Sequence, residues 1–192
     1  MILRRTSPAR APGQLLFYVL PQERSIAGNW EPPKGLSVNR WIPGLCQVRP
    51  WGADGRRWLV WWLFHHVHIF ANRSYEVVTV VEHGVVIHRA GVFPRYFRFP
   101  FMARSDVQIG DVWTAPQWRG RGLATWSIAA IASSCQERGG QAWYVTESTN
   151  EASRRSVERA GLVLDGTGRR VTRLGCSLLG GFVMDPRPHQ DS

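Results

Sequence analysis

The sequence predicts an α+β protein in which helices pack over a mixed sheet. Segments rich in β-branched residues alternate with segments of helical period, in the order strand, helices, three strands, helix, strand, helix and two strands. Hydrophobic residues make up 44% of the 192 residues, which is enough for one packed domain and too many for a wholly disordered chain. No internal repeat is visible.

The first 56 residues are rich in Pro, Gly and Arg, and within them residues 14–20 have the composition of a strand. A short helix is expected near residues 22–28, and Pro- and Gly-containing segments divide the remainder into loops. Residues 58–72 are apolar on most faces. Their Trp, Val and Phe would also suit a strand, but the length of the segment favours a buried helix.

The clearest local signal is a β-hairpin. Residues 75–82 and 85–92 are rich in β-branched side chains and flank a His83-Gly84 turn. A proline-bounded aromatic connection, residues 93–102, follows. Residues 106–114 then alternate polar and apolar side chains like a half-buried strand.

The C-terminal half changes period after Pro116. A helix is expected from residue 123 to about 138, where Gly139-Gly140 ends it. The remaining expected elements are a strand at 141–147, a helix at 150–160, strands at 162–165 and 171–184 around a turn at 166–170, and a tail at 185–192.

The net charge is +10, from 24 basic and 14 acidic residues, and all basic residues except Lys34 are arginine. A GC-rich genome also produces this bias, so the charge alone does not predict a nucleic-acid partner. It suits any polyanionic ligand, including a phosphorylated cofactor.

Cysteine usage and apolar run lengths predict a soluble, cytoplasmic protein without a membrane partner. Cys46, Cys135 and Cys176 form no CxxC pair, which favours a reducing compartment. The longest apolar stretch is shorter than the roughly 20 residues needed to cross a bilayer, and the N-terminal apolar run is too short for a secretory signal.

Residues 117–124, between a predicted strand and a predicted helix, form the most informative motif, which we call the glycine loop. Gly120 and Gly122 let the backbone approach a ligand, and free amides at a helix start attract an anion. Arg119 and Arg121 add positive charge. The loop lacks the Walker ending and the third glycine of the dinucleotide motif, and a simple connecting turn is the alternative.

The glycine loop resembles the signature of the GNAT superfamily of acyl-CoA-dependent N-acyltransferases. Gln117, Gly120 and Gly122 match its Gln/Arg-x-x-Gly-x-Gly/Ala pattern. A second family pattern, Asn-x(6)-Tyr-x(3)-Gly-Phe, is matched in register by Asn150 and Gly161, with leucine in place of its last residue. The resemblance covers about residues 74–175 and implies a mostly antiparallel sheet with a V-shaped cleft.

The resemblance also implies how acetyl-CoA would bind. Its pyrophosphate would lie on the amides of the glycine loop, and its pantetheine arm would run along the end of the 106–114 strand, where an amide polarises the thioester carbonyl. The implied cofactor-binding residues are Val112, Thr114, Gln117, Arg119, Gly120, Arg121, Gly122, Leu123, Ala124, Asn150 and Ser153.

Direct transfer needs an uncharged amine, so a base must remove a proton from the acceptor. Asp106 and Glu147 are the candidate bases; Asp111 is a third, and strand alternation lets only one of Asp106 and Asp111 face the cleft. The alternative for each carboxylate is that it is simply exposed to solvent at the end of a strand, without a catalytic role.

The family's usual acid, a tyrosine, falls at Val157, which cannot donate a proton. Tyr144 and Tyr96 are the candidate replacements, and Tyr144 could alternatively pack within its strand. Because this acid is missing, an inactive member of the family that only binds CoA stays open as an alternative.

Arg95, Tyr96 and Arg98 connect the hairpin to the cleft strand and are the candidate acceptor residues. Alternating arginines and aromatics suit a planar anionic acceptor such as a nucleotide-linked amino sugar, whereas a proline-bounded loop could simply pack its rings inward. No metal is expected, since the spacing of His65, His66 and His68 on a helix does not bring two imidazoles together.

We therefore expect a single domain over residues 1–184: a variable part (1–73) that shapes the acceptor site or a homodimer contact, and a cofactor-binding core (74–184). The expected activity is acetyl transfer from acetyl-CoA to a primary amine of a small molecule, for instance an amino sugar, by direct attack in a ternary complex. Two alternatives remain: a non-catalytic CoA-binding protein, and an acetyltransferase acting on a protein or, given the +10 charge, on RNA.

Overall fold

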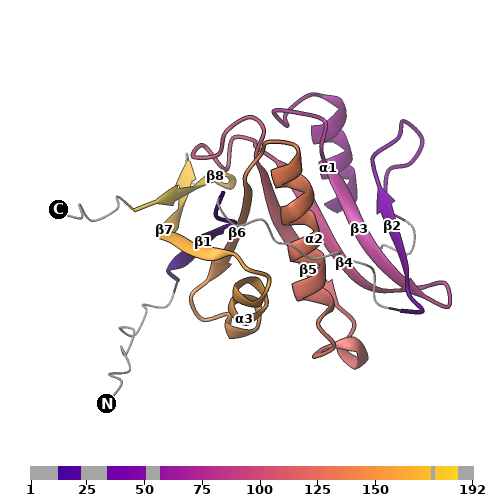
Figure 1. Ribbon diagram of the computed structural model, residues 1–192. Coiled ribbons are helices and arrows are strands. Elements are labelled where there is room, and N and C mark those ends of the chain that lie inside the picture. The colour runs from indigo at the N-terminus through magenta and orange to yellow at the C-terminus, as the bar shows by residue number, and fades with distance from the viewer. Residues whose placement is uncertain (1–12, 23–33, 51–56, 174–175, 186–192) are drawn as a thin grey trace, which may run out of the picture.

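The computed structural model describes residues 13–22, 34–50, 57–173 and 176–185, which contain one eight-stranded sheet (Figure 1). Its strands are β1 Leu15–Val19, β2 Ser37–Trp41, β3 Glu76–Glu82, β4 Val85–Pro94, β5 Val107–Thr114, β6 Ala142–Glu147, β7 Val163–Arg173 and β8 Cys176–Met184. The helices are α1 Arg57–His66, α2 Leu123–Glu137 and α3 Glu151–Arg159, with a 3-10 turn at Pro116–Trp118.

The sheet has the order β2-β3-β4-β5-β6-β1-β7-β8, and β5 and β6 form its one parallel pair within the described residues. The predicted α+β class with a mixed, mostly antiparallel sheet is confirmed. No helix in the described part of the chain is long and apolar enough to span a bilayer.

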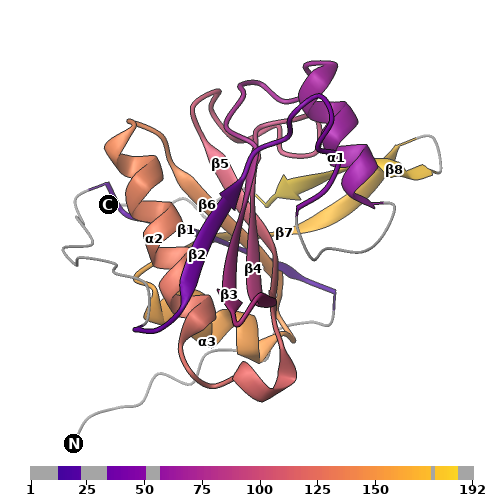
Figure 2. The same cartoon turned by 90° about the vertical axis from the view of Figure 1, so that its right-hand side faces the viewer.

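Helices cover both faces of the sheet because its central strands are apolar on both sides. Val78 on β3 and Val92 on β4 pack in one core with residues of α2, whereas Val77 and Phe93 pack in a second, aromatic core with Trp58 of α1. Adjacent residues of a strand point to opposite faces, so the two cores lie on opposite sides. Figure 2 shows α2 and α1 on these two sides.

The parallel pair β5–β6 is short and then opens. Pairing runs through Val107↔Ala142, Gln108↔Trp143 and Ile109↔Tyr144, after which β5 continues without β6 as a neighbour. Since α2 connects these two strands, its N-terminus lies at the end where they separate. The opening positions the site described below.

Two expectations about strands are wrong. The segment containing β2 was expected to be loop, but it pairs with β3 as an edge strand. Its side chains are mostly exposed and polar, so no alternation marks it. The expected turn at residues 166–170 is continuous strand, and β7 and β8 are connected at residues 174–175.

The glycines that suggested that turn serve close packing instead. A Cβ on Gly168 would lie 2.1 Å from the Val183 carbonyl oxygen and 2.8 Å from the Phe17 ring. Glycine therefore allows β8 and a core aromatic ring to approach the strand.

The helix expected over residues 58–72 ends at His66, and His68 adopts a left-handed φ of 59°. The other helices and the β3–β4 hairpin lie within one or two residues of expectation, with His83 and Gly84 both at positive φ in the turn. The helix expected near residues 22–28 and the tail beyond residue 185 fall outside the described residues.

Candidate active site

A groove of about 460 Å³ lies where β5 has separated from β6, between the start of α2 and one face of α3. Its lining residues come from β5, the glycine loop, the first turn of α2, β6 and α3. They are Val112, Trp113, Thr114, Trp118, Arg119, Gly120, Gly122, Leu123, Ala124, Thr125, Tyr144, Asn150, Ala152, Ser153, Ser156 and Arg159. We call this the groove.

Bare backbone forms one end of the groove. Gly120 and Gly122 have φ of 78° and 81°, and a Cβ at either position would meet no atom within 4 Å. Helix α2 starts after Gly122 without a side-chain cap, and its first amides belong to groove-lining residues. Uncapped amides at a helix N-terminus carry partial positive charge, so this end of the groove favours an anion.

Positive side chains lie near those amides. Arg119 Nε donates to the Thr114 carbonyl oxygen at 3.2 Å, and Arg159 lines the groove from α3. Arg121 stacks over the Trp118 ring at 4.3 Å from its centroid. Among the predicted cofactor-binding residues, Arg121 and Gln117 alone do not line the groove.

Helix α3 forms the opposite wall. Asn150 caps the helix, since its Oδ1 accepts from the Ser153 amide at 3.1 Å. Tyr144 on β6 is buried, and burial raises the pKa of its hydroxyl while a hydrogen bond to Ser153 lowers it. The net effect keeps Tyr144 protonated at neutral pH, as a proton donor requires.

A second hollow of about 360 Å³ is also lined in part by β5, and we call it the aromatic pocket. Its lining residues are Trp61, Phe93, Tyr96, Arg98, Phe99, Gln108, Gly110, Asp111 and Phe182. Asp111 lines this pocket, whereas the next residue, Val112, lines the groove, so β5 contributes neighbouring residues to both cavities.

Asp111 lies in an irregular part of β5. Its φ is 49°, and the pairing of β4 with β5 shifts register between Arg89 and Gly91, so β5 contains one extra residue there. The Asp111 carboxylate pairs with Arg89 at 3.2 Å. The bulge lies where β5 passes from lining the aromatic pocket to lining the groove.

The structure places the two predicted bases elsewhere. Asp106 accepts hydrogen bonds from the amides of Ala103 and Gln141 and from Trp143 Nε1, at 2.8, 3.0 and 3.0 Å, and therefore fixes the start of β5. Glu147 is exposed at the end of β6. Neither residue lines the groove or the aromatic pocket.

The three predicted acceptor residues are divided between cavities. Arg98 lines the aromatic pocket, Arg95 lines a separate pocket, and Tyr96 contributes to both. Burial raises the pKa of Tyr96 to about 12. Val157, the position of the family's usual acid, is fully buried in the core beneath α3, so its side chain does not reach the groove.

Sequence reasoning missed six residues of the groove: Trp113, Trp118, Thr125, Ala152, Ser156 and Arg159. The first three are sequence neighbours of predicted residues. Ser156 and Arg159 follow Ser153 at intervals of three, and this spacing indicates one helix face. No group of three His, Cys, Asp or Glu side chains suited to a metal occurs within the described ranges.

The sequence matches the family model "Acetyltransferase (GNAT) family" over residues 45–162, more than half of the chain. The chain therefore belongs to the GNAT acetyltransferase family. The sequence has no match among curated proteins.

Solved structures with the same fold include a GCN5-related N-acetyltransferase from Sphaerobacter thermophilus. The TM-score is 0.57 at 18% identity, covering 82% of this chain and 50% of that one. A GNAT-family acetyltransferase from Colwellia psychrerythraea gives a TM-score of 0.50 at 16% identity, covering 79% and 53%. This chain spans about half the length of both proteins.

Proposed function

We propose that this protein transfers an acetyl group from acetyl-CoA to a primary amine of a small molecule, by direct attack in a ternary complex. The observation that carries the proposal is the opening of the sheet after Ile109 onto the uncapped N-terminus of α2, with Gly120 and Gly122 bare beside it. This combination supplies a long groove with an anion-binding end.

Chain groups suited to hold acetyl-CoA lie along the whole groove. The amides of Leu123 and Ala124, with Arg119 beside them, suit the pyrophosphate. The β5 backbone near Val112 and Thr114 no longer pairs with β6, so it is available to the amide-containing pantetheine arm. When bound, acetyl-CoA supplies an acetyl group activated as a thioester.

The aromatic pocket suits the acceptor. A free alkyl amine has a pKa near ~10.4, so a base has to remove its proton before attack. Asp111 is the carboxylate that lines this pocket, and we assign it that role in place of Asp106 and Glu147. Tyr144 lies in the groove with its proton retained and would protonate the departing thiolate.

The aromatic walls support a ring-containing acceptor such as an amino sugar or a nucleotide-linked amino sugar. The rings of Trp61 and Phe182 can pack on the apolar face of a sugar ring, and Arg98 can pair with an anionic substituent. Such an acceptor has both the ring and the charge that the pocket offers.

Location and assembly are part of the same proposal. Cys46 and Cys135 are free thiols, which supports the cytoplasm as the location. Leu59, Val60 and Leu63 of helix α1 and Val67 just after it are each roughly half exposed, which supports a homodimer contact on that helix.

The test is calorimetry with acetyl-CoA followed by a thiol-release assay over amino sugars, amino acids and polyamines. We expect one acetyl-CoA per chain and CoA release with at least one ring-containing amine. Absence of acetyl-CoA binding would contradict the proposal. Binding without turnover on any amine would instead support the non-catalytic, CoA-binding alternative that the missing acid at Val157 raises.

A further inference from the structure

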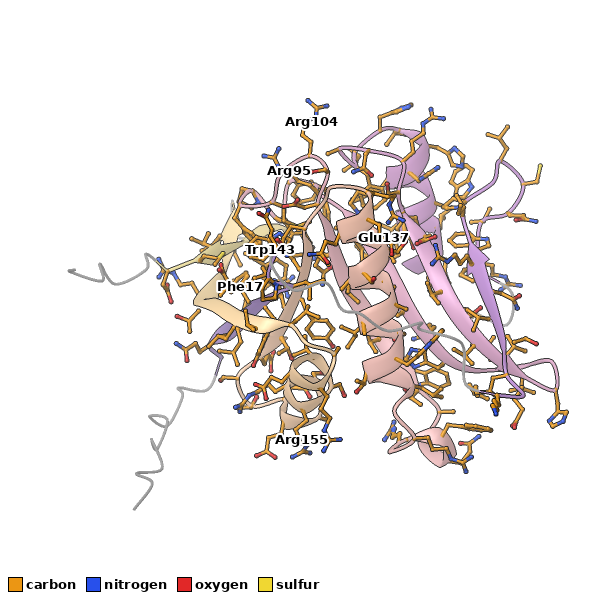
Figure 3. The ribbon with its side chains drawn as sticks, in the orientation of Figure 1. Phe17, Arg95, Arg104, Glu137, Trp143 and Arg155 are labelled. Atoms are coloured by element: carbon orange, nitrogen blue, oxygen red, sulfur yellow. The ribbon has the colours of Figure 1, made fainter. Side chains whose placement is uncertain are left out.

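A further cavity lies away from the groove, and we call it the basic pocket. It has a volume of about 570 Å³ and is formed by the end of α1, residues 67–73 and residues 95–104. Three arginines, Arg73, Arg95 and Arg104, line it. Figure 3 shows Arg95 and Arg104 projecting at the same end of the molecule.

Within the described residues, these arginines have no carboxylate partner. No Asp or Glu lines the basic pocket, and within the described ranges none of the three pairs with a carboxylate. Four other arginines do pair with carboxylates: Arg40 with Glu76, Arg89 with Asp111, Arg155 with Glu151 and Arg169 with Asp185. The concave surface therefore concentrates three positive charges.

Two histidines border the same pocket. Arg73 Nη2 lies 2.9 Å from His68 Nε2, and arginine can only donate in this contact. His65 Nδ1 is buried and has no hydrogen-bond partner among the described residues. Burial, followed by the charges of His66, Arg73 and His68, lowers the pKa of His65. The positive charge of the pocket therefore comes from its arginines.

The loop that carries two of the arginines is held in place. The Asn72 side-chain amide donates to the Arg104 carbonyl oxygen at 2.7 Å, and the Ala71 amide donates to the Arg95 carbonyl oxygen at 2.8 Å. These bonds join the segment after α1 to the 95–104 segment. The two backbone segments that bear the arginines are therefore held together by hydrogen bonds.

From this geometry we propose that the basic pocket binds the phosphoryl group of a small phosphorylated ligand. A guanidinium group can donate two parallel hydrogen bonds to the oxygens of one phosphoryl group. A phosphoryl group carries nearly two negative charges, so it matches the charge of three arginines better than a single carboxylate does. The cavity is larger than one phosphoryl group, and the exposed ring of Phe97 offers an apolar contact for the rest of the ligand.

The basic pocket lies beside the proposed acceptor site without being part of the groove. Tyr96 lines both the basic pocket and the aromatic pocket, whereas no residue lines both the basic pocket and the groove. The inference rests on the basic pocket alone and is independent of whether the groove binds acetyl-CoA.

The test uses inorganic pyrophosphate as the probe, measured by calorimetry on the full chain. Because the glycine loop is a second anion site, titrations are done on the wild type and on a Gly122→Trp background. In both backgrounds, we expect Arg95→Gln and Arg104→Gln each to weaken pyrophosphate affinity at one site by about tenfold or more. This is the effect of losing one charge-assisted hydrogen bond.

Arg138→Gln is the matched control, because this substitution removes the same charge at a residue outside the pocket. Arg138 is exposed at the end of α2 and lines none of the three cavities. We expect it to change pyrophosphate affinity less than twofold. An equal loss in Arg138→Gln, or affinities within twofold of the parent for both Arg95→Gln and Arg104→Gln, would overturn the proposal.

Succinate at the same ionic strength distinguishes phosphate from carboxylate recognition. We expect weaker binding than for pyrophosphate, and equal or tighter binding in the basic pocket would overturn the phosphoryl assignment. Failure of acetyl-CoA to bind the wild type would contradict the proposed function and leave these arginine-dependent results unaffected.

Discussion

At the residue scale, Asp111 shows how a bulge in a strand can change the cavity that a side chain lines. In a regular strand, side chains alternate between faces, but the adjacent residues Gly110 and Asp111 both line the aromatic pocket. The extra residue and the positive φ of Asp111 explain this change. The bulge therefore places the Asp111 carboxylate in the lining of the aromatic pocket.

Asp111→Asn tests the base. Asparagine adopts left-handed φ as readily as aspartate, so the bulge should persist. We expect kcat to fall by about 10²- to 10⁴-fold, the usual contribution of a general base, with acetyl-CoA affinity unchanged. Steady-state kinetics and calorimetry measure these two effects.

The control for this substitution is Arg89→Gln, which removes the ion-pair partner but keeps the carboxylate. It should retain most of the kcat. Turnover by Asp111→Asn at the wild-type rate would show that the proton leaves by another route.

His88 links three elements beneath the groove. It is fully buried on β4, and its Nδ1 and Nε2 lie 2.8 Å from Thr114 Oγ1 and 2.9 Å from Ser127 Oγ. Ser127 also donates to the Ala124 carbonyl oxygen at 3.1 Å, so Ser127 accepts from Nε2 and Thr114 donates to Nδ1. A neutral imidazole therefore connects the end of β5 to the first turn of α2.

This burial makes stability depend on pH. The pKa of His88 is lowered from 6.5 to about 4, mainly by burial and secondarily by Arg89. Between pH 6.5 and 4 the unfolded chain binds a proton that the folded chain does not, so His88 lowers the free energy of unfolding by roughly 3 kcal/mol as pH falls through this window. Above pH 6.5 this effect is absent.

Urea unfolding of the wild type and of His88→Gln at pH 7, 6, 5 and 4.5 measures the contribution. We expect the variant to be the less stable protein at pH 7 and the difference to narrow as pH falls. A difference that stays constant with pH would show that His88 can be protonated in the folded state.

At the scale of elements, the two helices that flank the groove begin differently. The α3 N-terminus is capped by Asn150, whose side chain satisfies the Ser153 amide. The α2 N-terminus follows a left-handed glycine and has no side-chain cap. One helix start is therefore satisfied within the chain, and the other leaves amides for a ligand.

Gly122→Trp tests the anion-binding end of the groove. The indole would enter the open space over the glycine loop, so acetyl-CoA affinity should fall by about 100-fold or more, since each charge-assisted hydrogen bond contributes about 1.5–3 kcal/mol. Calorimetry measures the loss.

Gly139→Trp is the matched control for backbone strain. Gly139 also has a positive φ, 73°, and open space at its Cβ, but it lies at the other end of α2 and outside the groove. Its acetyl-CoA affinity should match that of the wild type. Loss of affinity in both variants would indicate damage to α2 rather than a blocked site.

At the scale of the whole molecule, the N-terminal strand β1 is an interior strand of the sheet. β1 lies between β6 and β7, paired antiparallel to both, although more than 120 residues separate it from either along the chain. Leu16 and Phe17 are fully buried. Since β6 carries Tyr144, β1 also supports one wall of the groove.

Leu16→Ala should therefore lower the free energy of unfolding by about 2–5 kcal/mol, the usual effect of a leucine truncation in a packed core. Leu63→Ala on the exposed side of α1, where the leucine is 46% exposed, should have a much smaller effect. Urea unfolding measures both. Equal effects would show that β1 is not part of the cooperative core.

The sequence by itself determined the elements whose signals are local. The β3–β4 hairpin, helix α2 and the glycine loop follow from side-chain period, turn residues and glycines with positive φ, each read from a few adjacent residues. The family match over residues 45–162 agrees with this part.

The tertiary structure alone decided which strands are neighbours and which side chains meet. The position of β1, the polar edge strand β2 and the placement of Asp111 in the aromatic pocket depend on pairing between distant segments and on one bulge. A shift of one residue in register reverses the face of a side chain, and no local pattern encodes that shift.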